Sequence, residues 1–236
     1  MENKKSVWVG LLTYNEEENL RVLIPQINEA FADRLAGVDY SINVVDARKT
    51  TDDTKELCQE QGVNYYVQDG YGQADAMRCA IKLCDKDLFL VLDADCSHNP
   101  IYIPDIYNNF VSNDGDIVIG SRYVPGGKTN DKKISQIMSH ILNGVMRVVL
   151  GLKTKDISGG YRLYDAAQLK AIEIASTNFE MQQEILARMK ANNRSIKIGE
   201  TPIVFEKRLN GTSTRRLMLY IICYIKNIFR VIKILH

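Results

Sequence analysis

The sequence predicts a single α/β domain in which a mostly parallel sheet is covered by helices on both faces. Short apolar runs alternate with segments whose apolar residues recur at helical spacing. The run at 88–92 is apolar at every position, which is typical of a strand buried on both faces of a parallel sheet. Asp46 and Asp93 directly follow two of these runs, at the strand ends where open α/β sheets bind ligands.

The first half of the chain alternates strictly between predicted strands and predicted helices. Strands are expected at residues 7–12, 40–45, 63–67, 88–92 and 116–120. Asn15 is the expected N-cap of the first helix, whose first turn holds three glutamates. Further helices are expected at 50–62, 74–84 and 100–110. Such alternation implies parallel strands that are joined by helical crossovers.

The second half of the chain is richer in predicted helix. A long amphipathic helix is expected at 134–149, followed by a Gly-rich segment at 157–162. Two short helices at 166–174 and 181–191 precede a strand at 196–205. We expect one domain at residues 1–214 and a basic amphipathic helix at residues 215–236, with its regular part at 217–235.

The composition is that of a folded globular protein, with 45% hydrophobic and 25% charged residues. Five cysteines without CxxC spacing favour reduced thiols in a cytosolic setting over disulfides or a zinc site. No signal-peptide pattern is found, and no apolar run approaches the roughly 20 residues that span a bilayer. Neither GxGxxG nor GxxxxGKS is present, so dinucleotide and P-loop sites are not expected.

The charge is distributed unevenly. The net charge is +1, but residues 197–236 carry +6, which leaves −5 for residues 1–196. In the last helix Lys226, Arg230 and Lys233 share one face and apolar residues the other, a pattern typical of helices in a membrane interface. The alternative is a helix that packs on the domain with its lysines in water. We expect peripheral attachment at the cytoplasmic face of a membrane, with or without a membrane-embedded partner subunit, and no nucleic-acid partner.

Asp93 and Asp95 are the candidate metal ligands. Residues i and i+2 of a strand point the same way, so the two carboxylates would project together. Hard oxygen ligands beside substrate phosphates suit Mg²⁺ or Mn²⁺. An isolated Asp-x-Asp is better explained as an Asx-rich turn that leaves a strand. The acid at the end of a second strand, Asp46, and the motifs below favour the metal site.

Several motifs together resemble the inverting family 2 glycosyltransferases of the GT-A fold, a Rossmann-like three-layer α/β/α sandwich with a mostly parallel mixed sheet. They are most similar to the hexosyltransferases of polyprenyl phosphates, of the dolichol-phosphate mannose synthase type. The matching motifs, between about residues 6 and 214, are Thr13-Tyr14-Asn15-Glu16, Leu92-Asp93-Ala94-Asp95-Cys96-Ser97-His98, Ile119-Gly120-Ser121-Arg122-Tyr123-Val124, Ser158-Gly159-Gly160-Tyr161-Arg162, Gln183-Glu184, and Ile198-Gly199-Glu200-Thr201-Pro202-Ile203 with Phe205, Arg208, Gly211 and Ser213.

The resemblance implies roles for the residues at matching positions. Asp93 and Asp95 would hold the metal against the diphosphate of a nucleotide sugar, and Asp46 would accept hydrogen bonds from the base. Arg122 would contact the acceptor phosphate, and Arg208 with Ser213 would close over the site. The other residues expected at the donor or its phosphates are Thr13, Tyr14, Glu16, Gly72, Ala94, Lys132 and Lys133.

The acceptor decides which catalytic groups are needed. A phosphate acceptor is largely ionised at neutral pH, its second pKa being about 6, so it needs little help from a base. It needs cations that bring two anions together, and Arg122, Arg208, Lys132 and Lys133 suit that task. A hydroxyl acceptor would need a positioned carboxylate base, for which Glu184 is the candidate.

The expected function is metal-dependent transfer of a hexose, with mannose from GDP-mannose favoured, to a dolichyl or undecaprenyl type of polyprenyl phosphate. Leu12, Ala47, Asp69 and Thr214 depart from the family pattern around the nucleotide and phosphates. Two alternatives therefore stay open. One is a family member that uses UDP-glucose or another UDP-sugar, or a non-lipid acceptor. The other is a catalytically silent nucleotide-binding scaffold.

Overall fold

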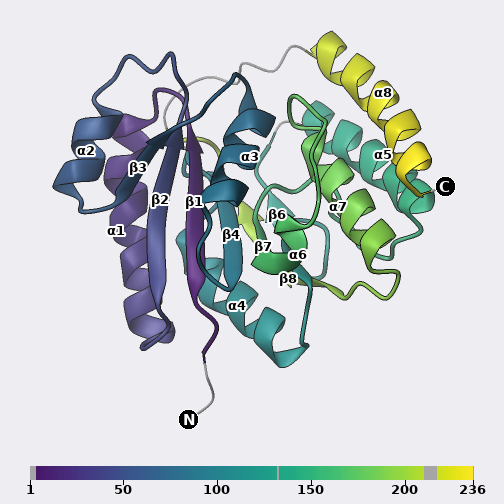
Figure 1. Cartoon of the computed structure of the whole chain (residues 1–236). Coiled ribbons are helices and arrows are strands. Elements are labelled where there is room, and N and C mark those ends of the chain that lie inside the picture. Colours follow the sequence, from purple (N-terminus) through teal and green to yellow (C-terminus); the bar gives the residue numbers. More distant parts are fainter. Residues whose placement is uncertain (1–3, 132, 210–216, 236) are drawn as a thin grey trace.

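A seven-stranded mixed sheet forms the centre of the protein in the computed structural model (Figure 1). The structure describes residues 4–131, 133–209 and 217–235, with residues 217–225 described by their helical backbone. The strand order is β3-β2-β1-β4-β7-β5-β8, and β7 is antiparallel to its two neighbours. The strands of this sheet are β1 Val7–Thr13, β2 Tyr40–Asp46, β3 Asn64–Val67, β4 Leu88–Asp93, β5 Ile117–Ser121, β7 Arg162–Asp165 and β8 Ile198–Pro202.

Helices cover both faces of the sheet, which gives the expected three layers. The helices of the first face are α1 Glu17–Arg34, α2 Thr54–Glu60 and α4 Ile103–Ser112, preceded by the short 3₁₀ helix η1 Pro100–Tyr102. Those of the second face are α3 Gln73–Leu83, α5 Lys133–Leu150, α6 Ala166–Lys170, α7 Met181–Asn192 and α8 Leu217–Leu235. Side chains alternate along each strand: Val9 and Leu11 pack under α1, whereas Trp8 faces α3 and stacks on Phe89.

The order of the strands places a crevice beside β1. The chain runs outward from β1 to β2 and β3, and then returns to the other side of β1 as β4. The crossover helices α1 and α2 lie on the first face, whereas α3, which brings the chain back past β1, lies on the second. The carboxyl ends of β1 and β4 therefore meet at the point where the strand order reverses direction. The predicted acids lie at this edge of the sheet.

Strand β7 and the division of the last predicted strand differ from expectation. The segment Arg162–Asp165 is too short and too polar for its pattern to indicate a strand, yet it pairs with both β4 and β5. Buried Arg162 donates hydrogen bonds to the backbone carbonyls of Ile157, Gly159 and Gln182. The predicted strand at 196–205 is two strands, because Pro202 cannot donate an N–H to continue the ladder. After Pro202, β9 Val204–Phe205 pairs with β6 Lys128–Thr129 in a separate two-stranded sheet.

The predicted cap of the first helix is wrong. Asn15 has a left-handed backbone, with φ at 54°, and its side chain accepts a hydrogen bond from the Thr51 N–H. The first helical N–H, on Glu17, donates instead to Asp52. The loop after β2 therefore supplies the cap, and this loop delays the start of α2 to Thr54.

Helix α8 packs against the domain, along α7 and α5 (Figure 1). Val231 is fully buried, and Asn227 donates a hydrogen bond to the Glu180 carbonyl at the start of α7. Arg230 donates to Ser176 and lies 3.6 Å from Glu184. The structure thus has the docked helix that was the alternative, while the boundary expected at 214/215 falls outside the described residues. Within the described chain, no helix has the length and apolar character needed to cross a membrane.

Candidate functional site

A pocket of about 980 Å³ opens at the carboxyl ends of β1, β2, β3 and β4. Most of the predicted site residues line it. From the first strand and its loop come Thr13, Tyr14 and Glu16, and Gly72 comes from the start of α3. From β4 and its turn come Asp93, Ala94 and Asp95, and Arg208 comes from the segment after β9.

The two aspartates differ in their surroundings. Asp93 ends β4 and is 28% exposed, whereas Asp95 lies in the following turn and is 6% exposed. One oxygen of Asp95 accepts hydrogen bonds from the Ser97 N–H at 3.0 Å and hydroxyl at 2.5 Å. The other pairs with Arg208 Nε at 3.0 Å. Strand geometry therefore positions Asp93, while the turn, with Cys96 at φ 62°, positions Asp95.

The carboxylate of Asp93 has no cationic partner among the described residues. His98 Nδ1 lies 3.6 Å from Asp93 Oδ2, but it accepts a hydrogen bond from the Asp93 N–H, so this nitrogen carries no proton. Burial lowers the pKa of His98, which keeps the ring neutral. Asp93 thus presents a carboxylate to the pocket without a hydrogen-bond donor from the described chain.

Glu16 adds a third carboxyl group to the end of the pocket that holds Asp93 and Asp95, here called the acidic end. Burial raises its pKa, and the nearby charges of Asp95 and Asp93 raise it further. A hydrogen bond from Asn19 and the charge of Arg208 act in the opposite direction. The acidic end therefore has an excess of negative charge that a bound cation would relieve.

Arg208 is held over Asp95 by backbone hydrogen bonds. Glu206 N–H donates to the Ser97 carbonyl at 2.9 Å, and Leu209 N–H donates to the Asp95 carbonyl at 3.2 Å. Phe205 forms an antiparallel bridge with His98. Residues 205–209, here called the strap, therefore run alongside residues 95–98 and bring the guanidinium to the acidic end.

The donor set fits a hard divalent cation that is shared with a substrate. Asp93 offers a free carboxylate, and Asp95 offers one oxygen beyond its Ser97 bonds. In the described residues no three His, Cys, Asp or Glu side chains converge as a complete metal site. Phosphate oxygens of a substrate would have to supply the remaining ligands, as is usual for Mg²⁺.

Gly72 closes one side of the pocket and can only be glycine without strain. Its φ is +84°, and a Cβ atom there would lie 2.8 Å from the Thr177 carbonyl oxygen. The residue N-caps α3 with no side chain of its own. The close approach brings the loop before α7 to the rim of the pocket, where Asn178 and Phe179 line it.

Asp46 does not line the pocket, which corrects its expected contact with the base. Its side chain is fully buried. It accepts hydrogen bonds from the hydroxyl groups of Thr13 and Thr50, each at 2.7 Å, and from Tyr65 at 3.1 Å. Asp46 therefore ties β1, β2 and β3 together beneath the pocket floor.

Arg122, the residue expected at the acceptor phosphate, is bound to a buried carboxylate and does not line this pocket. Asp156 is fully buried, and its carboxylate accepts hydrogen bonds from the backbone N–H, Nε and Nη2 of Arg122 at 3.0, 2.7 and 2.7 Å. Ser158 accepts a further bond from the guanidinium. Burial would raise the pKa of Asp156, but the bonds from Arg122 outweigh it, and the pKa lies below its ordinary value. The pair is ionised and fixes the start of the loop that follows β5.

Glu184 is also a structural ion, and this corrects its role as a candidate base. Its side chain is fully buried and accepts bonds from the N–H groups of Ala175 and Ser176 and from Arg188. These bonds outweigh burial, which acts to raise the pKa, so the pKa is lowered. Both oxygens are occupied away from the pocket, at the contact with Arg230 of α8.

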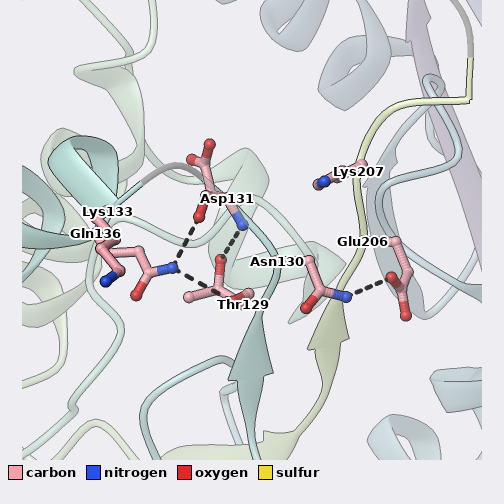
Figure 2. A pocket seen from close by; sticks show the side chains of 7 residues that line it. All are labelled: Thr129, Asn130, Asp131, Lys133, Gln136, Glu206 and Lys207. Carbon is pink, nitrogen blue, oxygen red and sulfur yellow. Dashed lines mark hydrogen bonds between the residues drawn. The ribbon is translucent and has the colours of Figure 1, made fainter.

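Lys133, the predicted lysine that the structure describes, does not line the pocket of Asp93 and Asp95. Lys133 lines a second pocket of about 600 Å³, and Figure 2 shows it across this pocket from Lys207. Asn130 donates to Glu206 at 2.7 Å and links the two sides. Lys132 and Ser213 lie outside the described residues.

The pocket lining also includes Arg48, Lys49 and Tyr71, which the sequence analysis did not predict. Arg48 and Lys49 follow β2 and lie over the ring of Tyr71, at 6.0 and 5.4 Å from its centre. Arg48 also donates to the Asp69 carbonyl. The departure at Ala47 and the Arg-Lys pair beside it were the available signal. Arg48 and Lys49 give the pocket a basic end at the ring of Tyr71.

Comparison with known proteins identifies relatives. Residues 8–172 match glycosyl transferase family 2. The dolichol-phosphate mannosyltransferase of Pyrococcus furiosus is 32% identical over 237 residues, which cover 96% of this chain and 64% of the relative. The undecaprenyl-phosphate mannosyltransferase of Micrococcus luteus is 30% identical, with 85% of this chain and 84% of the relative covered.

A solved structure shares the fold. Glucosyl-3-phosphoglycerate synthase from Mycobacterium tuberculosis, in complex with Mn²⁺, UDP and glucosyl-3-phosphoglycerate, matches with a TM-score of 0.74 at 16% identity. The match covers 98% of this chain and 80% of that one. The expected GT-A type of α/β fold is confirmed. The chain belongs to glycosyl transferase family 2, and its resemblance to the polyprenyl-phosphate mannosyltransferases of that family is confirmed.

Proposed function

We propose that this protein transfers a hexose, mannose from GDP-mannose, to a polyprenyl phosphate with inversion. The observation that carries the proposal is the pocket at the switch point of the sheet, with the free carboxylate of Asp93 beside Asp95. An acidic end, a basic end and about 980 Å³ suit a sugar nucleotide. The names of the two mannosyltransferase relatives support mannose as the sugar and a lipid phosphate as its acceptor.

Asp93 and Asp95 would hold Mg²⁺ or Mn²⁺ against the donor diphosphate. The cation would supply electrostatic stabilisation of the charge that develops on the leaving diphosphate. Arg208 is the cation of the described chain that already lies at this end of the pocket, paired with Asp95. Tyr14, which is exposed at the rim, and the Tyr71 ring are available to contact the nucleoside.

The surroundings of Glu184 and His98 favour a phosphate acceptor over a hydroxyl acceptor. Glu184 is buried and engaged, and His98 is buried and hydrogen-bonded. Neither side chain is placed to take a proton from a hydroxyl in the pocket. A phosphate acceptor is already anionic and needs no such base.

We also propose that the acceptor is met at a membrane surface, by α5 together with α8. Five apolar side chains form one exposed stripe along α5, at spacings of three and four residues: Ile134, Ile137, Ile141, Val145 and Val148. Phe229 and Ile232 of the adjoining α8 are exposed as well. Neither helix contains an aspartate or glutamate, whereas both contain lysine and arginine. Apolar residues with flanking cations suit the interface of an anionic bilayer.

Transfer and donor choice are tested together. We expect the protein with Mn²⁺ to move radiolabelled mannose from GDP-mannose into a lipid extract, and Asp93→Asn to abolish this without lowering thermal stability. The matched control is Asp114→Asn, which removes an exposed carboxylate elsewhere. Turnover with UDP-glucose alone would favour the second donor. Stabilisation by nucleotides without any turnover would favour the silent scaffold.

Membrane attachment is tested by vesicle flotation. We expect Ile141→Asp to reduce binding to vesicles that contain anionic lipid, and Val111→Asp on α4 to leave it unchanged. Both side chains are exposed, at 60% and 48%, so neither change should disturb the core. Deletion of α8 is a poorer test, because it would uncover the core around Val231. Equal flotation of the two variants would contradict the membrane proposal without touching the donor site.

A further inference from the structure

Arg208 occupies the place where a cation is expected to bind. Its Nε lies 3.0 Å from Asp95 Oδ2, and its charge acts on Glu16 together with those of Asp93 and Asp95. The Arg208 side chain is one-third exposed, and it lines the open pocket. The acidic end of the pocket is therefore already partly neutralised by the chain itself.

Asp95 has no room for two cations. Its Oδ1 is engaged by the Ser97 N–H and hydroxyl, and Oδ2 by Arg208, with 6% of the side chain exposed. An arginine does not lose its proton in proteins, so it cannot become neutral to admit a metal. A metal ion that binds Oδ2 must displace the guanidinium.

The strap lets the side chain move while its backbone stays. The backbone bonds of Glu206 to Ser97 and of Leu209 to Asp95 do not involve the Arg208 side chain. A guanidinium released from Asp95 would remain beside the pocket, where it could bind phosphate oxygens with two parallel hydrogen bonds. Binding of metal and binding of diphosphate would then be linked through one side chain.

We propose that Arg208 is the resident counter-ion of Asp95, and that a divalent cation binds by exchange with it, which frees Arg208 for the diphosphate of the donor. The exchange lowers the affinity for metal in the absence of a donor and raises the affinity for diphosphate once the metal is bound. The metal arm of this inference does not depend on the proposed transfer reaction. The diphosphate arm rests on it.

The test measures Mn²⁺ binding alone, from the electron paramagnetic resonance signal of the free ion. We expect Arg208→Gln to bind Mn²⁺ more tightly than the wild type, by on the order of tenfold, because Asp95 loses its ion-pair partner and Glu16 loses a nearby positive charge. Inorganic pyrophosphate, added with saturating Mn²⁺, should bind the same variant more weakly than the wild type. Lys207→Gln is the matched control: it removes the same charge from the adjacent position of the strap, and both affinities should stay within about twofold.

Each outcome bears on the inference. Unchanged or weaker Mn²⁺ binding by Arg208→Gln would overturn the exchange, as would an equal gain in Lys207→Gln. Arg208→Met, which keeps the aliphatic stem, serves as a second neutral variant with the same expectation. If both neutral variants failed to fold without metal, Mn²⁺ should restore folding, because it would take the place of the guanidinium at Asp95; failure of Mn²⁺ to do so would exclude the exchange. Tighter Mn²⁺ binding by Arg208→Gln, together with no sugar transfer by the wild type, would refute the proposed function and leave the metal arm standing.

Discussion

The buried pair of Asp156 and Arg122 allows a quantitative test of what Arg122 does. Asp156→Asn would leave the guanidinium without its carboxylate, although the Ser158 hydroxyl would still accept a bond. Asp156 is fully buried and Arg122 is 13% exposed, so little water can replace the lost partner. If Arg122 serves the fold, this variant must be unstable. If Arg122 serves mainly as a ligand of the acceptor phosphate, stability should change little.

The size of the effect follows from burial. Removing one partner of a buried ion pair costs about 3–5 kcal/mol, and the slight exposure of Arg122 places the expectation near 3 kcal/mol. For a protein of this length that corresponds to a fall in Tm of roughly 6–12 °C. Because the pKa of Asp156 is lowered in the fold, its contribution is complete above the unfolded pKa of about 3.9 and disappears as the pH falls through the folded value.

The assay is urea unfolding at pH 7 and again near pH 3. We expect a large difference between wild type and Asp156→Asn at pH 7 and a smaller one in acid. Asp114→Asn, which breaks the exposed pair with Lys197, is the control and should have no measurable effect. Adding Arg122→Met to Asp156→Asn should recover part of the loss, since the guanidinium that has lost the Asp156 carboxylate is then removed. A loss at pH 7 no greater than that of Asp114→Asn would refute the structural role.

Three further expectations concern other parts of the molecule. Glu184→Gln should lower the free energy of unfolding by about 2–4 kcal/mol at pH 7, because Arg188 and Arg230 lose a buried partner. Since the pKa of Glu184 is lowered in the fold, urea unfolding should show the difference in stability between wild type and variant shrink below the unfolded pKa of about 4.3. Gly72→Ala should lower the free energy of unfolding by about 1–3 kcal/mol, because φ is +84° and the added Cβ would lie close to the Thr177 carbonyl. Gly62→Ala, at φ +66° with no atom within 4 Å of the added Cβ, should lower it by less in the same denaturation assay. Arg48→Gln should weaken binding of a sugar nucleotide several-fold in a calorimetric titration and leave Mn²⁺ binding unchanged, because Arg48 lies over Tyr71 at the basic end of the pocket. An equal loss of Mn²⁺ binding would show that the two ends of the pocket are not independent.

The layers of the fold could be predicted because each depends on local pattern. Apolar runs gave β1, β2, β4 and β5 almost to the residue, and helical periodicity gave α1, α3 and α5. Strand β7 could not be found in this way, because its four residues are stabilised by pairing with β4 and β5 and by the carbonyl contacts of Arg162. The cap of α1 was missed for a similar reason: Asp52 reaches it from a loop 35 residues further along the chain.

The stripe on α5 shows a further limit of periodicity. The same spacing of apolar residues would be expected for a helix that packs on the core and for one that faces a membrane. In this structure Met146 and Leu150 are buried in the core of the second face, while Ile134, Ile137 and Val148 are exposed. Periodicity therefore identifies the helix but not the medium that its apolar face contacts.

The sequence motifs named charged residues but could not indicate the partners of their side chains. Sequence motifs named Arg122 and Arg208 as site residues, and in the structure an aspartate holds each of the two guanidinium groups. The burial of the partner distinguishes them. Asp156 is enclosed, so a substrate that drew Arg122 away would leave an unpaired charge in the core, at the cost estimated above. Asp95 borders the pocket, so a cation that enters the pocket can take the place of Arg208 on the Asp95 carboxylate as Arg208 leaves. Arg208 is therefore the arginine that can exchange partners during a reaction, and Arg122 is the one that fixes the loop beside it.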